Sequence, residues 1–229
     1  MSAFHGKQEV KDFCVTRMRK ERDRDNLITA LGDEAGYPLE IVHLGKAIFE
    51  GLPAEDAPDF ALAMFERVQP GADLSLVASY FFVRLLHDNE EGVNLFEQET
   101  CHCMVVANLY RLRIAGDEPT EKEWMSVANA ARRTAIAVRR SAVRETDHWK
   151  AEELSRNLWA VRVAVNAALV SQSRLPMELA WAVNAAARVV ASRTGEYAEQ
   201  ARMSAYKRMG EKLIELMAAA PVREEADAT

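Results

Sequence analysis

Two arginine pairs stand seven residues apart in the C-terminal half of the chain, and their chemistry suits anion binding. Arg132 and Arg133 form the first pair, and Arg139 and Arg140 form the second. Seven residues nearly complete two turns of an α-helix, so the two pairs stack on one side, and Arg144 continues the row. Planar guanidinium groups match the oxygen atoms of phosphate and carboxylate groups, so the row predicts a binding surface for an anion.

The distribution of charge agrees with this prediction. The chain has a net charge of -6, but residues 127–208 contain fourteen Lys and Arg against seven Asp and Glu, a local +7 that leaves -13 for the remainder. This asymmetry indicates either docking between the two parts of the chain or an anionic ligand for the basic part. A solvated arginine face is the simpler alternative. Few aromatic residues interleave with the arginines, so base stacking is not favoured, although nucleic acid stays an open alternative.

A repeated pentapeptide, Ala-Val-Asn-Ala-Ala, occupies 164–168 and 182–186, with a permuted copy at 127–131. A tryptophan stands near each copy: Trp159, Trp181 and Trp124. Small side chains allow close approach of two helices, so the repeats predict a packing seam in which the tryptophans fill the remaining space. The repeats contribute three polar residues: Asn129, Asn166 and Asn184. A buried amide needs hydrogen-bond partners, so these asparagines either fix helix register or line a ligand site.

Cys101-His102-Cys103 has the residue types of a zinc site but not the spacing. Adjacent residues on a helix point about 100° apart, whereas a helical zinc site uses positions three or four apart. With Cys14 the chain has three cysteines, an odd number that does not favour a disulfide framework. We therefore predict no metal ion, no other cofactor and a pair of half-buried helical cysteines.

A catalytic alternative rests on His43, His87 and Asp88. Together with a distant carboxylate such as Asp117, they form the minimal residue set of a His-Asp metal phosphohydrolase, in which divalent metals activate water. A histidine near a helix C-terminus is also explained by the helix dipole. The sequence contains no Gly-rich phosphate loop, no Gly-x-Ser-x-Gly motif and no His-Glu-x-x-His motif. A non-enzymatic protein is favoured.

The periodicity of apolar residues predicts an all-α fold, a compact bundle of about nine helices. Thr120 and Glu123 form a capping box, the strongest helix start in the chain. Gly32, Gly51, Gly116 and Pro221 mark helix ends. The expected helices cover residues 7–31, 38–51, a short segment around 60–65, a segment after Asp73, 93–115, 121–145, 149–172, 176–193 and 196–219.

The chain is expected to form two halves and a tail. The link 116–120 separates an acidic helical half, 1–116, from a four-helix half rich in Ala and Arg, 117–221, on which it packs. Residues 222–229 are predicted to be a flexible tail. No apolar run approaches the roughly 20 residues of a membrane span, and no signal pattern begins the chain. A cytoplasmic protein that does not contact a membrane is expected.

Several segments resemble an uncharacterised family of hypothetical proteins from bacteriophages and prophages. The similar stretches are Phe4-His5-Gly6, Ile48-Phe49-Glu50-Gly51-Leu52-Pro53, Pro70-Gly71-Ala72-Asp73-Leu74-Ser75, Gly116-Asp117-Glu118-Pro119-Thr120 with Trp124, the Ala/Trp-rich helices, and Lys212-Leu213-Ile214-Glu215-Leu216-Met217 before Pro221. They span nearly the whole chain. The family's Gly/Cys-rich segment with a histidine is missing, because Leu31-Gly32 passes directly to Asp33-Glu34.

The resemblance implies a phage or prophage origin and no defined activity. It favours an accessory protein that acts by binding, such as an inhibitor of host defence, in the cytoplasm of the host cell. Its partner is expected to be a host protein or an anionic, nucleotide-like small molecule. The metal-dependent phosphohydrolase and a structural or assembly homo-oligomer are the two alternatives.

Overall fold

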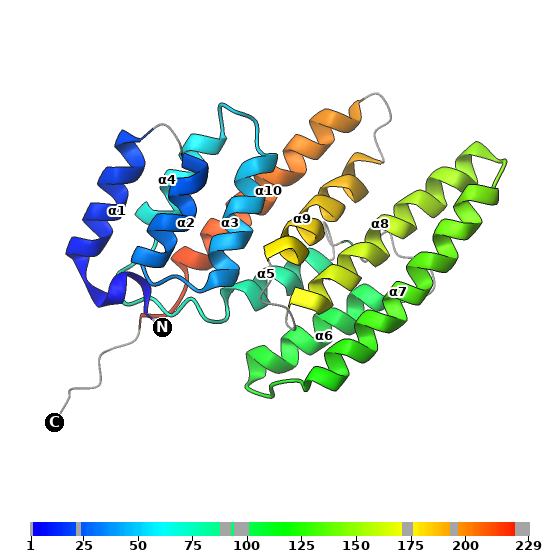
Figure 1. Ribbon diagram of the computed structural model, residues 1–229, viewed down its shortest axis with the longest axis horizontal. Helices are drawn as coiled ribbons and strands as arrows, with labels where there is room; N and C mark the ends of the chain where they lie inside the picture. The colour runs from blue at the N-terminus through cyan, green and yellow to red at the C-terminus, as the bar shows by residue number, and fades with distance from the viewer. Residues whose placement is uncertain are drawn as a thin grey trace. The chain divides into compact units, whose positions relative to one another are not determined.

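The computed structural model confirms the all-α prediction. It describes residues 2–21, 24–87, 93, 101–170, 176–192 and 197–222, without the side chains of 24, 25 and 176. Figure 1 shows the α-helices of these residues, which are α1 (Gln8–Lys20), α2 (Arg24–Glu34), α3 (Leu39–Gly51), α4 (Ala57–Glu66), α5 (Val77–Leu86), α6 (His102–Ala115), α7 (Glu121–Arg144), α8 (His148–Val170), α9 (Pro176–Ala191) and α10 (Ala198–Ala218). A 3₁₀ helix, η1 (Ala3–Gly6), precedes them. None of these helices is long and apolar enough to span a membrane.

Two compact units divide the chain. The first unit comprises residues 1–78 and 207–229, and the second comprises residues 79–206. These limits differ from the expected halves, which were divided near residue 116. The reason is that α6 and α7, which flank that link, pack against each other, while the end of α10 belongs to the first unit.

The first unit is built on contacts of α1 with α2 and α4, and of α3 with α2 and α4. Tyr37 is buried in this unit. Its ring stacks on Phe65, with centroids 5.4 Å apart, and meets the edge of Phe4 at 5.5 Å. The Tyr37 hydroxyl donates a hydrogen bond of 2.9 Å to the Met64 carbonyl, so this buried polar atom is satisfied. On α10, Gly210 lies against Phe60, and a methyl group there would come within 3.0 Å of the ring.

The first helix is shorter than the prediction of a single helix over 7–31. Glu21 adopts an extended conformation (φ -88°, ψ 142°), which ends α1, and α2 begins at Arg24. Gly32 lies inside α2 against Val42, and the left-handed turn falls at Gly36, where φ is +65°. The mixed charges of the segment around Glu21 provide no continuous apolar stripe, and such a stripe is what holds a helix on a core.

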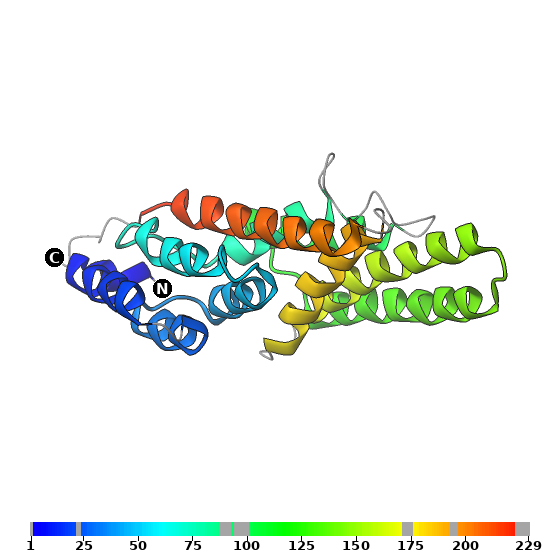
Figure 2. The same cartoon turned by 90° about the horizontal axis from the view of Figure 1, so that it is seen from above.

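The second unit centres on α8, which packs against α6, α7 and α9. Figures 1 and 2 agree that α7 and α8 lie side by side and run in opposite directions. The expected packing seam is present, because eight of the nine repeat alanines are fully or nearly fully buried: Ala128, Ala131, Ala164, Ala167, Ala168, Ala182, Ala185 and Ala186. The ninth, Ala130, is half-buried. The tryptophans fill it less than expected, since only Trp124 is buried and Trp181 is 50% exposed.

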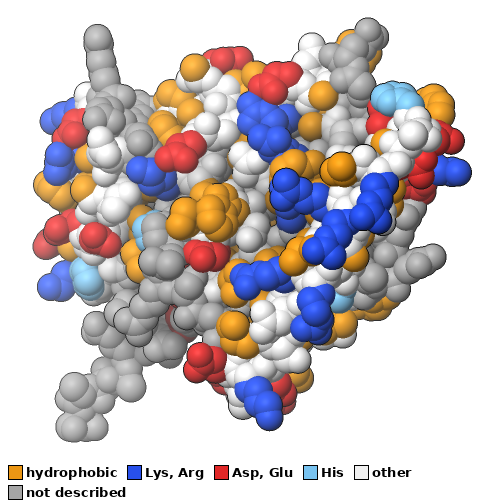
Figure 3. Space-filling model, turned by 45° about the vertical axis from the view of Figure 1, so that its right-hand side comes forward, with side chains coloured by type: hydrophobic (Ala, Val, Ile, Leu, Met, Phe, Trp, Pro, Cys, Tyr) orange, Lys and Arg blue, Asp and Glu red, His pale blue; other side chains and the backbone are white. Residues whose placement is uncertain are grey.

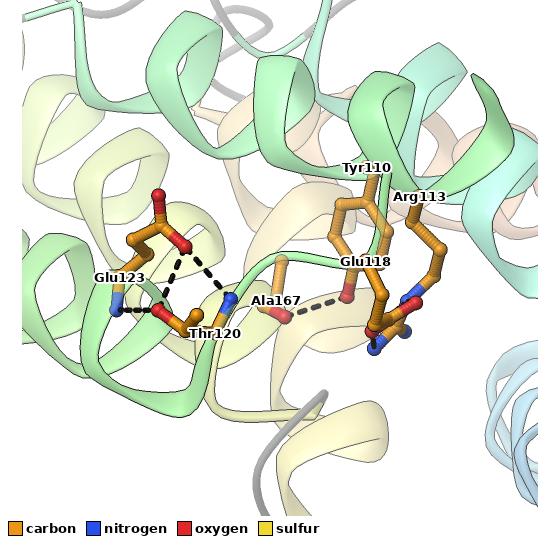
Figure 4. Close-up of polar contacts among 6 residues, drawn as sticks. All are labelled: Tyr110, Arg113, Glu118, Thr120, Glu123 and Ala167. Atoms are coloured by element: carbon orange, nitrogen blue, oxygen red, sulfur yellow. Dashed lines mark hydrogen bonds and ion pairs between the residues drawn. The ribbon is translucent and has the colours of Figure 1, made fainter. Parts of the chain in front are cut away.

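An aromatic cluster joins α6 to the rest of this unit. Tyr110 stacks on Phe82 at 5.1 Å and meets the edge of Trp124 at 4.9 Å. Its hydroxyl donates a 2.7 Å hydrogen bond to the Ala167 carbonyl on α8 (Figure 4). Above this cluster, the Arg113 guanidinium lies 5.4 Å from the Trp124 ring and forms an ion pair with Glu118.

The helix ends follow the sequence prediction most closely at α7. The Thr120 hydroxyl accepts a hydrogen bond from the Glu123 backbone N–H, and the Glu123 carboxylate accepts from the Thr120 backbone N–H at 2.7 Å. Figure 4 shows both halves of this capping box. At the end of α6, Gly116 has φ +92°, so the predicted stop is also present. The expected helix over 93–115 begins at His102 as α6, and residues 94–100 lie outside the described residues.

The capping box predicts a measurable loss when its hydroxyl is removed. Thr120→Ala should lower the free energy of unfolding by about 1 kcal/mol, because a helix N-terminal N–H loses its acceptor. Thr120→Ser should retain most of the stability. Urea unfolding followed by circular dichroism measures both variants. An alanine variant as stable as the original protein would contradict the structural role of the cap.

Candidate anion-binding site

Three arginines of the predicted row lie on α7 opposite its packed side. Trp124, Ala128 and Ala131 face the core of the second unit. At about 100° per residue, Arg133 and Arg140 point away from these buried residues, and Arg144 points the same way. All three side chains are exposed. They form an outer row, in which guanidinium groups follow one another along the helix.

Arg132 and Arg139 form a second row on the flank of the same helix. The two members of each arginine pair diverge by about 100°, so the pairs do not converge on a single point. The charge of Arg139 lowers the pKa of Arg162 on α8, which places these two guanidinium groups within electrostatic range. Figure 3 shows Lys and Arg side chains in a band on this face, with hydrophobic side chains among them.

Trp159 on α8 provides an aromatic surface for two arginines from different helices. The guanidinium of Arg162 lies 4.7 Å from the centroid of the Trp159 ring, and that of Arg188, from α9, lies 5.0 Å from it. Attraction between a cation and the indole face stabilises each arrangement by about 0.5–1 kcal/mol at an exposed site. Arg162 and Trp159 are half-buried. Burial lowers the pKa of Arg162, and the charges of Arg139 and Arg188 lower it further.

Asn184 holds Arg188 in this position. Its side-chain oxygen accepts a 2.8 Å hydrogen bond from Nε of Arg188, one helical turn later. Burial raises the pKa of Tyr206 on α10, while hydrogen bonding to Arg202 and Asn184 opposes that rise. The asparagine of the second repeat therefore connects Arg188 to Tyr206. Asn184 therefore acts as a positioning residue for the Arg188 guanidinium.

The arginines near Trp159 differ from several other arginines of the chain, which pair with carboxylates. Arg17, Arg113 and Arg202 form ion pairs with nearby glutamates. Among the described residues, no carboxylate forms an ion pair with the cluster or with the row on α7, that is, with Arg132, Arg133, Arg139, Arg140, Arg144, Arg162 or Arg188. We name Arg162 and Arg188, which lie over Trp159, together with Arg139, whose charge acts on Arg162, the Trp159 cluster. Three neighbouring cations without a described counter-charge are suited to binding an anion.

Comparison with family models, with curated proteins and with solved structures found no match to this chain. The chemistry of the Trp159 cluster therefore rests on its own geometry. Guanidinium groups from α7, α8 and α9 offer several N–H donors to the oxygen atoms of one ligand. The arginines of the cluster donate hydrogen bonds and do not accept protons, so an anion is the ligand class that this arrangement can hold.

The predicted site residues are only partly brought together. Arg139 and Asn184 belong to the Trp159 cluster or support it, whereas Asn129 and Asn166 are half-buried and have no side-chain hydrogen bond to a described residue. Trp159, Arg162 and Arg188 were not predicted. A local signal was present, because Trp159 and Arg162 are three residues apart and Asn184 and Arg188 are four apart, the spacings of neighbours on a helix.

The Cys101-His102-Cys103 segment points its side chains in different directions. Cys101 is exposed and has φ +49°, while the buried Cys103 donates a 3.5 Å hydrogen bond to the Ala160 carbonyl. The His102 ring nitrogen Nε2 lies 2.9 Å from the Thr134 hydroxyl. Among the described residues, no group of three or more His, Cys, Asp or Glu side chains is arranged to hold a metal ion.

The residues of the phosphohydrolase alternative belong to different parts of the chain. His43 is half-buried on α3 in the first unit, and His87 lies in the second unit. Nδ1 of His87 accepts a 2.9 Å hydrogen bond from Arg111, because a guanidinium only donates. Asp88 lies outside the described residues. Asp117 is exposed beside Gly116 at the start of the link to α7.

The burial of the cysteines predicts selective thiol chemistry. Cys14 and Cys103 are buried, and burial raises the pKa of the Cys14 thiol to about 11, so little thiolate is available there. At pH 8, a disulfide reagent such as dithionitrobenzoate should modify one thiol of the folded protein rapidly. Cys101→Ser should remove this fast phase, whereas the unfolded protein should expose all its cysteines. A fast phase that survives Cys101→Ser would contradict this burial.

His43 predicts a dependence of stability on pH. Burial lowers the pKa of His43 in the folded protein below its ordinary value of 6.5, although the negative charges of Asp33 and Glu40 act to raise it. The unfolded chain therefore binds the proton first as pH falls, so the contribution of His43 to stability is fully present above pH 6.5 and is lost as pH falls toward the folded pKa. His43→Gln, which does not titrate, should weaken the decrease in the urea midpoint between pH 7.5 and 5.5. An identical pH dependence in both proteins would exclude this contribution.

Proposed function

We propose that this protein is a binding protein, and that its Trp159 cluster holds the phosphate group of a small anionic ligand. The observation that carries the proposal is that Arg162 and Arg188, from two helices, lie over one tryptophan, while the charge of Arg139, from a third helix, acts on Arg162. No carboxylate among the described residues forms an ion pair with any of the three. Neighbouring positive charges raise the free energy of the unliganded site, and an anion removes this cost.

A phosphate ester fits this arrangement better than a carboxylate does. A phosphate group carries close to two negative charges at neutral pH and three acceptor oxygens, which can serve guanidinium groups from different directions. A single carboxylate offers one charge and a planar pair of oxygens. The nucleotide-like ligand expected from the sequence is therefore the favoured class.

The biological role is the broader part of the proposal. The resemblance of the chain to phage and prophage proteins supports an accessory protein that sequesters a host nucleotide signal. Mass spectrometry of small molecules that co-purify with the protein tests this role. A phosphorylated compound that is retained by the original protein, and lost from an Arg162→Ala/Arg188→Ala variant, is the expected result.

Direct titration tests the site itself. Isothermal titration with pyrophosphate or ATP should show binding that weakens by at least about 100-fold in Arg162→Ala/Arg188→Ala, since each of the two lost hydrogen bonds to a charged group contributes roughly 1.5–3 kcal/mol. Arg113→Ala is the matched control. It removes an arginine that also stacks on a tryptophan but has Glu118 as partner, and it should leave ligand binding unchanged.

The fluorescence of Trp159 gives a second readout. A phosphate beside the ring should change the emission of the original protein, and Trp159→Phe should abolish that change while the other three tryptophans remain. Unfolding midpoints of all variants show whether they are folded. If the folded Arg162→Ala/Arg188→Ala variant binds pyrophosphate and ATP as tightly as the original protein does, the Trp159 cluster is not the site.

A further inference from the structure

Two large apolar side chains on α7 are exposed on its flank. Ile136 is 47% exposed and Val143 is 80% exposed, although the opposite side of the same helix is buried. They stand seven residues apart, so they lie close to one line along the helix, with a rise of about 10.5 Å between them. Seven residues is the spacing at which one helix presents its contact residues to another.

Arginines surround Ile136 on every side along the helix. Positions three and four residues away are the immediate neighbours on a helix surface. For Ile136 these positions are all arginine: Arg132, Arg133, Arg139 and Arg140. The side chains of these four residues are exposed, and no described carboxylate forms an ion pair with them. We call Ile136, Val143 and these four arginines the Ile136 surface.

The composition of this surface restricts the chemistry of what covers it. A second copy of α7 on the same face would bring arginines against arginines, an arrangement that like-charge repulsion disfavours. A nucleic-acid backbone would pair with the guanidinium groups but would leave Ile136 and Val143 without an apolar partner. A lipid surface requires an apolar face with the basic residues beside it, whereas here the basic residues enclose the apolar one.

We propose that the Ile136 surface docks an acidic amphipathic helix of a partner protein. Apolar side chains of that helix cover Ile136 and Val143, and Glu or Asp residues on both sides of its apolar stripe pair with the surrounding arginines. This is the division of roles in paired helices, where apolar positions provide contact area and flanking charges select the partner. The surface consists of α7 residues only; it shares Arg139 with the Trp159 cluster and does not include Arg162 or Arg188.

The test uses designed peptides as probes. The first peptide is a helix with Leu at heptad contact positions and Glu at the flanking positions. The second has Lys in place of Glu, and the third has the composition of the first in scrambled order. Fluorescence anisotropy should show binding of the first peptide only, because both the charge and the apolar stripe are needed. Equal binding of the scrambled peptide, or none by the first, would overturn the proposal.

Substitutions test whether the peptide binds at the Ile136 surface. Arg133→Glu/Arg140→Glu should weaken binding of the first peptide at least about 10-fold, because two attractions become repulsions. Lys122→Glu/Lys150→Glu is the matched control, since it changes the net charge equally and lies outside the surface, and it should have little effect. Ile136→Ala should also weaken binding, whereas Leu112→Ala, at a similarly exposed position on α6, should not.

Two further probes separate the competing occupants. Single-stranded and double-stranded oligonucleotides and phosphatidylserine vesicles are tested against the same variants. If either binds in an Ile136-dependent manner and the acidic peptide does not, the surface belongs to that ligand instead. Pyrophosphate binding should persist in Arg133→Glu/Arg140→Glu, because all three arginines of the Trp159 cluster, including the shared Arg139, are unchanged. Failure of the Ile136 surface and failure of the Trp159 cluster are therefore distinguishable.

Discussion

Close packing of α8 against its neighbours is the constraint on which the rest of the second unit depends. Buried alanines at the contacts, interspersed with valines, allow the helix axes to approach closely. Because the contact side chains are so short, the long residues at the edges of the seam reach one another across helix boundaries. Trp159, Arg162 and Arg188 meet for this reason, although they come from two helices.

The electrostatic consequence is unfavourable in the absence of a ligand. Burial lowers the pKa of Arg162, the charges of Arg139 and Arg188 lower it further, and the indole of Trp159 attracts the guanidinium. Arg113, in the same unit, also stacks on a tryptophan, Trp124, but its charge is balanced by an ion pair with Glu118. A stacked arginine is therefore compatible with a carboxylate partner in this fold, and the Trp159 cluster differs in having none among the described residues.

Local signals predicted the fold well, whereas tertiary contacts determine the candidate site. The capping box at Thr120 and the stop at Gly116 depend on a few adjacent residues, so the sequence alone was sufficient. The break at Glu21 was missed because charged residues there are compatible with an exposed helix. The Trp159 cluster combines α7, α8 and α9, and no spacing along the chain specifies which flanks of these helices face each other.

The asparagine repeats show how the same local sequence takes on different roles. Asn166 and Asn184 occupy the same place in identical pentapeptides, and both are half-buried. Four residues later the first repeat has Val170 and the second has Arg188, so only Asn184 has a guanidinium at the distance of one helical turn. Contact with Tyr206 on α10 then gives its amide a second partner. The pentapeptide determines the packing of the helix, and the residue that follows it determines whether its asparagine supports the arginine cluster.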